Sequence, residues 1–216
     1  MLKKILTFIQ YKTSWLTILG LLAITCLMMF MMNGTQLPFS NPTIVEHSGG
    51  LTVLDTRASF SPDDAYGLFT ELGTAGRRAY LIFHLVPDMI FPIGYALTFA
   101  FISAWFLVRL LPLDHRLQWL SMIPLISGLA DVIENLSLVI CNLVYPGRID
   151  WLVRFAHLLT KVKFGLLPIG LVFLTIIVVV WFIQKRPASN VPGKPQQNSG
   201  NQTEVLDAVY SGNRQK

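Results

Sequence analysis

Residues Phe164–Ile183 read FGLLPIGLVFLTIIVVVWFI, a run of twenty residues without a charge. A helix needs about 20 predominantly apolar residues to cross the hydrocarbon core of a bilayer. This stretch therefore predicts a transmembrane helix. The uncharged run Met89–Val108 reaches the same length, and the run Trp15–Asn33 comes close to it. These three runs predict three membrane spans.

A fourth span is predicted between the second and the last of these runs, over about residues 117–145. It is interrupted by Asp131 and Glu134, which lower its hydropathy. We therefore expect an all-α membrane protein with four transmembrane helices and a short amphipathic helix on its outer face. The expected parts are a cytoplasmic N-terminus at 1–14, a transmembrane domain at 15–186 with spans at about 15–33, 79–109, 117–145 and 151–185 and an outer loop at 34–78, and a tail at 187–216.

The composition supports a membrane protein of one domain. Of the 216 residues, 53% are apolar and 13% are charged, whereas soluble domains carry roughly 25% charged residues. This argues against a disordered chain and against an ordinary soluble globule. The two cysteines, Cys26 and Cys141, lie far apart in apolar runs, so they predict no redox pair, zinc site or disulfide framework.

The charges around the spans predict the orientation in the membrane. The termini and the connection between the second and third spans carry ten basic and three acidic residues, and the other two connections carry four basic and six acidic ones. By the positive-inside rule both termini are cytoplasmic. The excess of basic over acidic residues is then explained by the membrane topology, so nucleic-acid binding is not expected. The first span follows Lys3, Lys4 and Lys12 and lacks a small-residue cleavage site, which favours an uncleaved signal-anchor over a cleaved signal.

The outer loop contains two predicted elements. Residues 43–47 and 51–54 flank Ser48-Gly49-Gly50, a pattern typical of a short hairpin. Residues 62–72 predict an amphipathic helix with Ser61 as N-cap, acidic residues in the first turn and Gly73 as C-cap. This helix either lies along the membrane surface or packs on the bundle.

The last thirty residues, 187–216, are rich in Asn, Gln, Gly, Ser and Pro. This composition predicts a disordered cytoplasmic tail. Within it, residues 204–210 could form a brief helix or a docking peptide.

Polar residues recur at helical spacing on three of the four spans, which places each set on one face. Because charges facing lipid cost roughly 2.5–3.5 kcal/mol each, we expect these faces to turn inward and form a charge-balanced cluster. Lys163 lies off the face of the fourth span and is expected to snorkel outward. The face of the second span consists of His84, Asp88, Pro92 and Tyr95. The face of the third span consists of Pro124, Ser127, Gly128, Asp131, Glu134, Asn135 and Asn142. The face of the fourth span consists of Arg154, His157, Lys161, Gly165 and Pro168.

The helical rise predicts the depth of this cluster. Counted from the cytoplasmic ends, Asp88, Glu134 and Lys163 lie about 26–30 Å along their helices, and Asp131 about 21 Å. Since the hydrocarbon core is about 30 Å thick, the charges meet near the outer boundary. The sequence therefore predicts an outward-facing polar vestibule that helix 62–72 covers. The cytoplasmic half of each span lacks charges, which argues against a continuous proton or ion pathway.

This vestibule suggests a pocket for a small amphipathic or lipid-like ligand. Acid–base catalysis would fall to Asp131, Glu134 and His84. Ligand binding would fall to Asp88, Tyr95, Asn135, Arg154, His157 and Lys161, with Arg77 and Arg78 at the rim. Membrane lipids are the expected partners, and no metal or cofactor is assigned. The motifs of P-loop NTPases, HExxH metalloproteases and GxSxG hydrolases do not occur.

Two other interpretations remain open. The charges could serve helix packing alone in a scaffold, an accessory subunit of another membrane protein or a homo-oligomer, with Gly165 and Gly170 allowing close helix contact. Alternatively, His84 and His157 could be the axial ligands of a haem.

Overall fold

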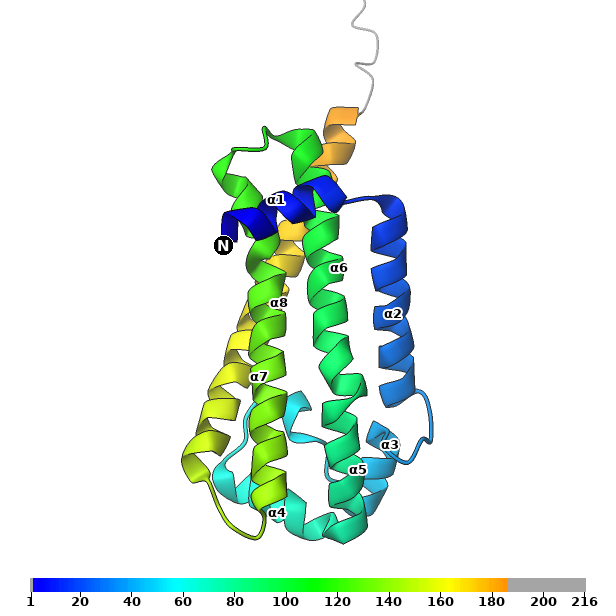
Figure 1. Cartoon of the computed structure of the whole chain (residues 1–216), viewed down its shortest axis with the longest axis vertical. Coiled ribbons are helices and arrows are strands. Elements are labelled where there is room, and N and C mark those ends of the chain that lie inside the picture. Colours follow the sequence, from blue (N-terminus) through cyan, green and yellow to red (C-terminus); the bar gives the residue numbers. More distant parts are fainter. Residues whose placement is uncertain (1, 186–216) are drawn as a thin grey trace, which may run out of the picture. The chain divides into compact units, whose positions relative to one another are not determined.

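A computed structural model of the chain describes residues 2–185, which form helices and connecting segments without a strand (Figure 1). Four helical stretches are long and apolar enough to cross a membrane: Trp15–Asn33, Gly73–Leu110, Arg116–Val144 and Asp150–Gln184. These match the four predicted spans, although the second begins earlier than expected. The predicted tail at 187–216 lies outside the described residues.

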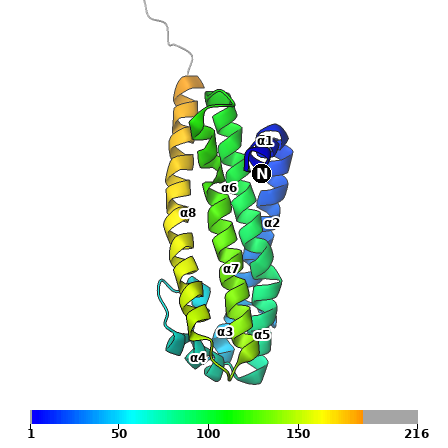
Figure 2. The same cartoon turned by 60° about the vertical axis from the view of Figure 1, so that its left-hand side comes forward.

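The compact unit Met1–Trp181 contains all the helices except the last residues of the fourth span. In it α6 (Pro87–Leu110) packs against α2 (Trp15–Asn33) and against α7 (Ile123–Val144) (Figures 1 and 2). In their most apolar windows, 67% of the residues of the second span and 56% of those of the third are buried, against 17% in the first and 11% in the fourth. The second and third spans are therefore the inner ones.

The second span is built from two helices, α5 (Gly73–Leu85) and α6, which meet at Val86. Pro87 follows Val86 and has no backbone N–H, so the helical hydrogen-bond pattern is broken there. Val86 takes φ −116° and ψ −81°, outside the helical region. The break separates His84, at the end of α5, from Asp88, in the first turn of α6.

The hairpin predicted around Gly49-Gly50 is wrong. Residues 41–47 form the helix α3 (Asn41–His47), and residues 54–56 form the short 3₁₀ helix η1 (Leu54–Thr56). Pro42 in the first turn favours the helix, and Ile44 is fully buried within it. Gly49 and Gly50 do form a turn with positive φ angles, but this turn follows a helix instead of joining two strands.

Where the sequence predicts the amphipathic helix, the structure has the helix α4 (Pro62–Glu71). Its apolar face is buried in a cluster with α5, and Leu68 and Phe69 are fully buried. The helix therefore packs on the bundle. The prediction that Gly73 ends this helix is confirmed, because Gly73 follows the cap residue Leu72 with φ +58°, the left-handed conformation typical of a glycine directly after a helix. Gly73 is also the first residue of α5.

Ser61 caps α4 through a reciprocal pair of hydrogen bonds. The Asp64 N–H donates to Ser61 Oγ at 3.2 Å, and the Ser61 N–H donates to Asp64 Oδ2 at 2.7 Å. The hydrogen bonds from Ser61 also lower the pKa of Asp64.

Replacing Ser61 with alanine should lower the free energy of unfolding by about 1 kcal/mol, because the helix loses its N-cap. Urea or SDS titration of the full chain in detergent would measure the change. Ser61→Thr is a matched control at the same position, because threonine keeps the side-chain oxygen that caps the helix. An equal loss in both variants would contradict the capping role.

Two elements at the other end of the bundle were not predicted. The helix α1 (Leu2–Lys12) precedes the first span, buries Leu6 and Ile9, and packs against α6. The third span begins with η2 (Arg116–Met122), a 3₁₀ helix that leads into α7. The side chain of Gln10 donates to the Leu113 carbonyl at 3.2 Å, which ties α1 to the connection before η2.

The core of the bundle consists of two apolar clusters with a polar layer between them. One cluster joins α4 and α5 to Leu138 of α7 and Ala156 of α8 (Asp150–Lys185). The other joins α1, α2 and the second half of α6 to Ile177 of α8. On α7 and α8, the buried polar residues Ser127, Asp131, Glu134, Asn135, Thr160 and Lys163 lie between the two clusters along the helix. Apolar packing therefore closes the polar layer at both ends.

Candidate functional site

The polar layer brings together four acidic side chains and one lysine. Each of the five is at most 7% exposed. They come from four elements: Asp55 from η1, Asp88 from α6, Asp131 and Glu134 from α7, and Lys163 from α8. Asp131 and Glu134 share one face of α7 because they are three residues apart. The prediction that the acidic residues of the second and third spans face inward is therefore confirmed.

Lys163 is the centre of this cluster. Its Nζ lies 2.9 Å from Asp131 Oδ1 and 2.9 Å from Glu134 Oε2. It also donates a hydrogen bond to the backbone carbonyl of Asp55 at 3.2 Å. One ammonium group thus joins α8 to α7 and to η1.

Neutral side chains complete the contacts of the two α7 carboxylates. Thr160 of α8 donates to Glu134 Oε1 at 2.6 Å, and the Tyr95 hydroxyl donates to Asp131 Oδ2 at 3.1 Å. Asn135 donates to the backbone carbonyl of Asp88 at 2.6 Å, near the break before α6. Both carboxylates of α7 are therefore held by Lys163 and by a hydroxyl.

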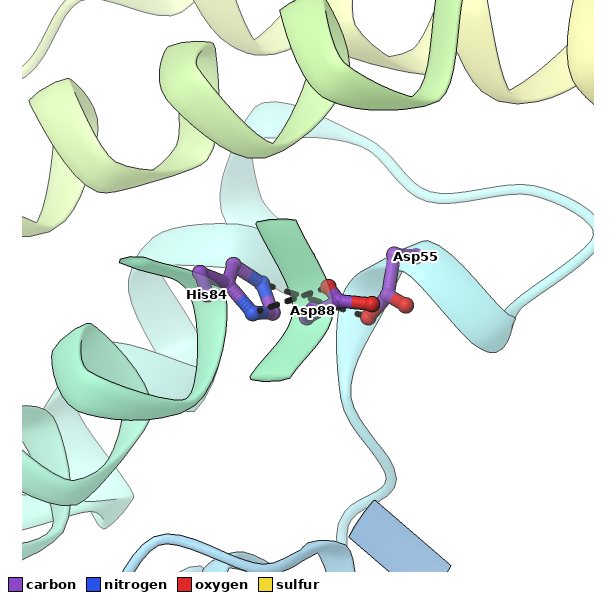
Figure 3. A group of neighbouring side chains, drawn as sticks. All are labelled: Asp55, His84 and Asp88. Atoms are coloured by element: carbon purple, nitrogen blue, oxygen red, sulfur yellow. Dashed lines mark ion pairs between the residues drawn. The ribbon is translucent and has the colours of Figure 1, made fainter. Parts of the chain in front are cut away.

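His84 faces the two remaining carboxylates, Asp88 and Asp55 (Figure 3). Its Nδ1 is 3.4 Å from Asp88 Oδ2, and its Nε2 is 3.9 Å from Asp55 Oδ1. The ring of Tyr80 packs against the imidazole, with 4.1 Å between ring centroids. Neither ring nitrogen makes a hydrogen bond, and neither do Asp55 Oδ1 and Asp88 Oδ2. The polar atoms that Asp55, His84 and Asp88 turn toward one another are therefore buried without a hydrogen-bond partner.

The charges of the cluster are not balanced by its side chains. Four carboxylates face one ammonium group, and buried charges are costly unless they are paired. Burial raises the pKa of Asp55, and the positive charge of Lys163 opposes this shift. Further positive charge, as protons or as a bound cation, would compensate the excess. Asp55, His84 and Asp88 could hold such a cation, since one possible ligand atom of each lies within 4.8 Å of the others.

Asp55 is the member of the cluster that sequence reasoning missed. It lies in a connecting segment that predicted a hairpin, so no helical spacing linked it to the spans. The sequence offers only a weak indication of its role, namely that Asp55 follows the apolar Leu54, which the structure shows to be fully buried.

The prediction for the fourth span is wrong. α8 turns Val153, Ala156, Thr160 and Lys163 inward, while Arg154, Lys161, Gly165 and Pro168 are exposed and His157 is half-buried. Val153 and Ala156 lie in the same apolar cluster as Leu138 of α7, and Lys163 contacts the two α7 carboxylates. Lys163 therefore does not snorkel outward. The predicted vestibule is instead a closed cluster.

Arg154, His157 and Lys161 of α8 line two hollows. On their other side, the hollows are lined by residues of the connection before α4 and of its first turn. One hollow has a volume of about 420 Å³ and is lined by Ser59, Phe60, Ser61, Pro62, Asp64, Arg154 and His157. The other has a volume of about 490 Å³ and is lined by Thr56, Ala58, Lys161, Phe164 and Gly165. We call these two hollows together the α8 groove. His157 Nε2 lies 3.2 Å from Ser59 Oγ, which fastens the segment to α8.

Two other predicted site residues, Arg77 and Arg78, lie apart from both the cluster and the groove lining. Arg77 donates to the Phe69 carbonyl and stacks over Tyr145, and Arg78 is exposed on α5.

His157 packs on Phe60 at the groove, whereas His84 packs on Tyr80 inside the cluster. The two histidines have different neighbours, so the structure does not pair them as haem ligands.

Together, the four helical stretches that are long and apolar enough to cross a membrane indicate an integral membrane protein. No known protein family, curated protein or solved structure matches the chain.

Proposed function

We propose that the protein binds a small amphipathic, lipid-like ligand with an anionic head group in the α8 groove. The observation that carries this proposal is the row of Arg154, His157 and Lys161 along one side of α8, turned away from the bundle. Arg154 and Lys161 are seven residues apart, or about 10 Å along the helix. Together they can contact a phosphate or carboxylate and its neighbouring polar groups.

The surroundings of the groove suit the rest of such a ligand. Beyond Lys161, α8 continues as an apolar helix whose side chains Phe164, Ile169 and Val172 are exposed. An acyl chain can lie along this surface while the head group stays at the cationic row. The volumes of the two hollows also fall within the range of small-molecule sites, roughly 300–1,000 Å³.

For topology, we propose that the groove and α4 lie on the outer face and that both termini are cytoplasmic. The helix α1 supports this, because it carries Lys3, Lys4 and Lys12 and lies at the end of the bundle opposite α4 (Figure 1). The first span would then be an uncleaved signal-anchor. The short four-span architecture favours the bacterial plasma membrane. Protease protection of the α4 segment in oriented vesicles would test the topology.

The alternative is a scaffold or accessory subunit, alone or as a homo-oligomer, whose buried charges serve helix packing alone. The pairing of Lys163 with two α7 carboxylates favours this alternative. However, the scaffold alternative assigns no role to the exposed row of Arg154, His157 and Lys161. Processing of the ligand by Asp131, Glu134 or His84 would require access to side chains that are buried in the described structure, so we propose binding without catalysis.

A charge-removal experiment tests the lipid site. The double variant Arg154→Gln/Lys161→Gln should bind a short-chain phosphatidic acid about tenfold or more weakly than the natural chain, because charge-assisted hydrogen bonds contribute about 1.5–3 kcal/mol each. Native mass spectrometry of the full chain from mild detergent would measure binding. It would also show which lipids the protein retains from its membrane.

The control removes two exposed charges from the opposite end, as Lys12→Gln/Arg116→Gln. It should bind like the natural chain, and both variants should melt like it. Equal weakening in the two doubles, or equal affinity for a phosphatidylcholine of the same length, would contradict the proposal. A protein that retains only partner proteins and no lipid would favour the accessory subunit.

A further inference from the structure

We propose that Asp55, His84 and Asp88 bind a divalent transition-metal ion that fastens the η1 segment to the break between α5 and α6. One possible ligand atom from each of the three residues lies within 4.8 Å of the other two. They come from three different elements, and their side chains point toward one another (Figure 3). This inference stands apart from the lipid proposal, because none of the three residues lines the α8 groove.

The distances are close to those of a coordinated ion. Nitrogen and oxygen ligands lie about 2.0–2.2 Å from Zn²⁺, which places neighbouring ligand atoms roughly 3.0–3.6 Å from one another. His84 Nδ1 and Asp88 Oδ2 are already 3.4 Å apart, and His84 Nε2 and Asp55 Oδ1 are 3.9 Å apart. A single imidazole nitrogen would bind the ion. Asp55 comes from a connecting segment, so a small shift of its side chain would complete the contact.

The state of His84 independently indicates a ligand. The residue is fully buried, yet neither of its ring nitrogens makes a hydrogen bond. Buried polar groups are nearly always partnered, and the carboxylate oxygens facing this ring also lack a donor. A cation between them would supply the missing partner for one nitrogen and for both carboxylates.

The charge of the polar layer favours a divalent ion. With all four carboxylates ionised, Lys163 leaves an excess of three negative charges among buried side chains. Lys163 contacts Asp131 and Glu134 directly, whereas it reaches Asp55 only at its backbone carbonyl. The excess is therefore concentrated at Asp55 and Asp88. A divalent cation bound there would compensate most of it.

The donor set indicates the class of metal. Carboxylate oxygens alone suit Mg²⁺ and Ca²⁺, whereas an imidazole nitrogen favours transition metals such as Zn²⁺ and Fe²⁺. One imidazole and two carboxylates make a site for an ion of this second group. Because Asp55 precedes Thr56 and Ala58 of the α8 groove, the ion would also fix the inner end of the segment that forms that groove.

Zinc titration of the tag-free full chain in detergent tests this proposal. After chelator treatment and dialysis against Zn²⁺, the natural chain should retain a single Zn²⁺ by elemental analysis, and its melting temperature should rise with zinc concentration. Asp88→Asn and His84→Phe should each weaken zinc binding at least about tenfold, as loss of a ligand exceeds the effect of outer-shell changes. Phenylalanine preserves the ring that packs on Tyr80.

Asp114→Asn is the matched control, because Asp114 is an exposed carboxylate in the connection after α6. It should bind zinc like the natural chain. Absence of retained zinc in the natural chain, with a melting temperature that does not respond to the metal, would overturn the proposal even if a variant failed to fold. So would an Asp88→Asn protein that binds zinc normally. Lipid binding by the same preparations is a separate measurement, so failure of one proposal leaves the other open to its own test.

Discussion

Replacing Lys163 with methionine is expected to lower the free energy of unfolding by about 3–5 kcal/mol, the usual cost of breaking a buried ion pair from one side. Lys163 is the only buried cation among the described lysine and arginine residues, and it contacts both Asp131 and Glu134 at 2.9 Å. Methionine keeps the unbranched chain but leaves both carboxylates without their counter-charge. SDS titration in mixed micelles, followed by circular dichroism, would measure the loss.

Lys161→Met provides a sharp control, since Lys161 is exposed only two residues away on the same helix. Its substitution should change the stability by less than about 0.5 kcal/mol. Adding Asp131→Asn and Glu134→Gln to Lys163→Met should recover part of the stability, because the stranded charges are then removed. Equal effects of the two lysine substitutions, or no recovery in the triple variant, would refute the central role of Lys163.

This lysine pair also shows how far the sequence can predict the site. On α6 and α7, helical spacing identified the inward faces, because acidic and amide residues there stand out against apolar neighbours. On α8, the cationic residues occupy two different faces, and spacing grouped Arg154 with Lys161 instead of identifying Lys163. What decides between the faces is the close packing of Val153 and Ala156, together with the position of the carboxylates on α7. Neither can be obtained from one helix alone.

The α5–α6 break limits prediction in a different way. The proline at 87 predicts an irregularity, but the sequence of one span does not specify which segment packs beside it. The structure places η1 there, and this brings Asp55 to His84 and Asp88. Contacts between a connecting segment and a helix have no sequence period. The group formed by Asp55, His84 and Asp88 could therefore be predicted only in part.

The close contact between the inner helices supports a second large effect. A Cβ at Gly128 of α7 would lie 2.5 Å from the Ala96 Cβ and 2.8 Å from the Pro92 carbonyl oxygen of α6. Neither neighbour is the flexible end of a long side chain, so one helix must move. Gly128→Ala should therefore lower the free energy of unfolding by about 1–3 kcal/mol, as over-packing usually does. SDS titration would measure this change as well.

The predicted contact glycines serve as controls. A Cβ at Gly165 would have no atom within 4 Å, and one at Gly170 would meet only Pro124 and Ile123 side chains at 3.8 and 3.9 Å. Gly165→Ala should be neutral, or stabilising by up to about 1 kcal/mol through helix propensity. Since Gly128 lies one turn from Asp131, helices forced apart there should also lengthen the contact between Tyr95 and Asp131. A Gly128→Ala protein as stable as the natural chain would show that α6 and α7 do not approach each other this closely.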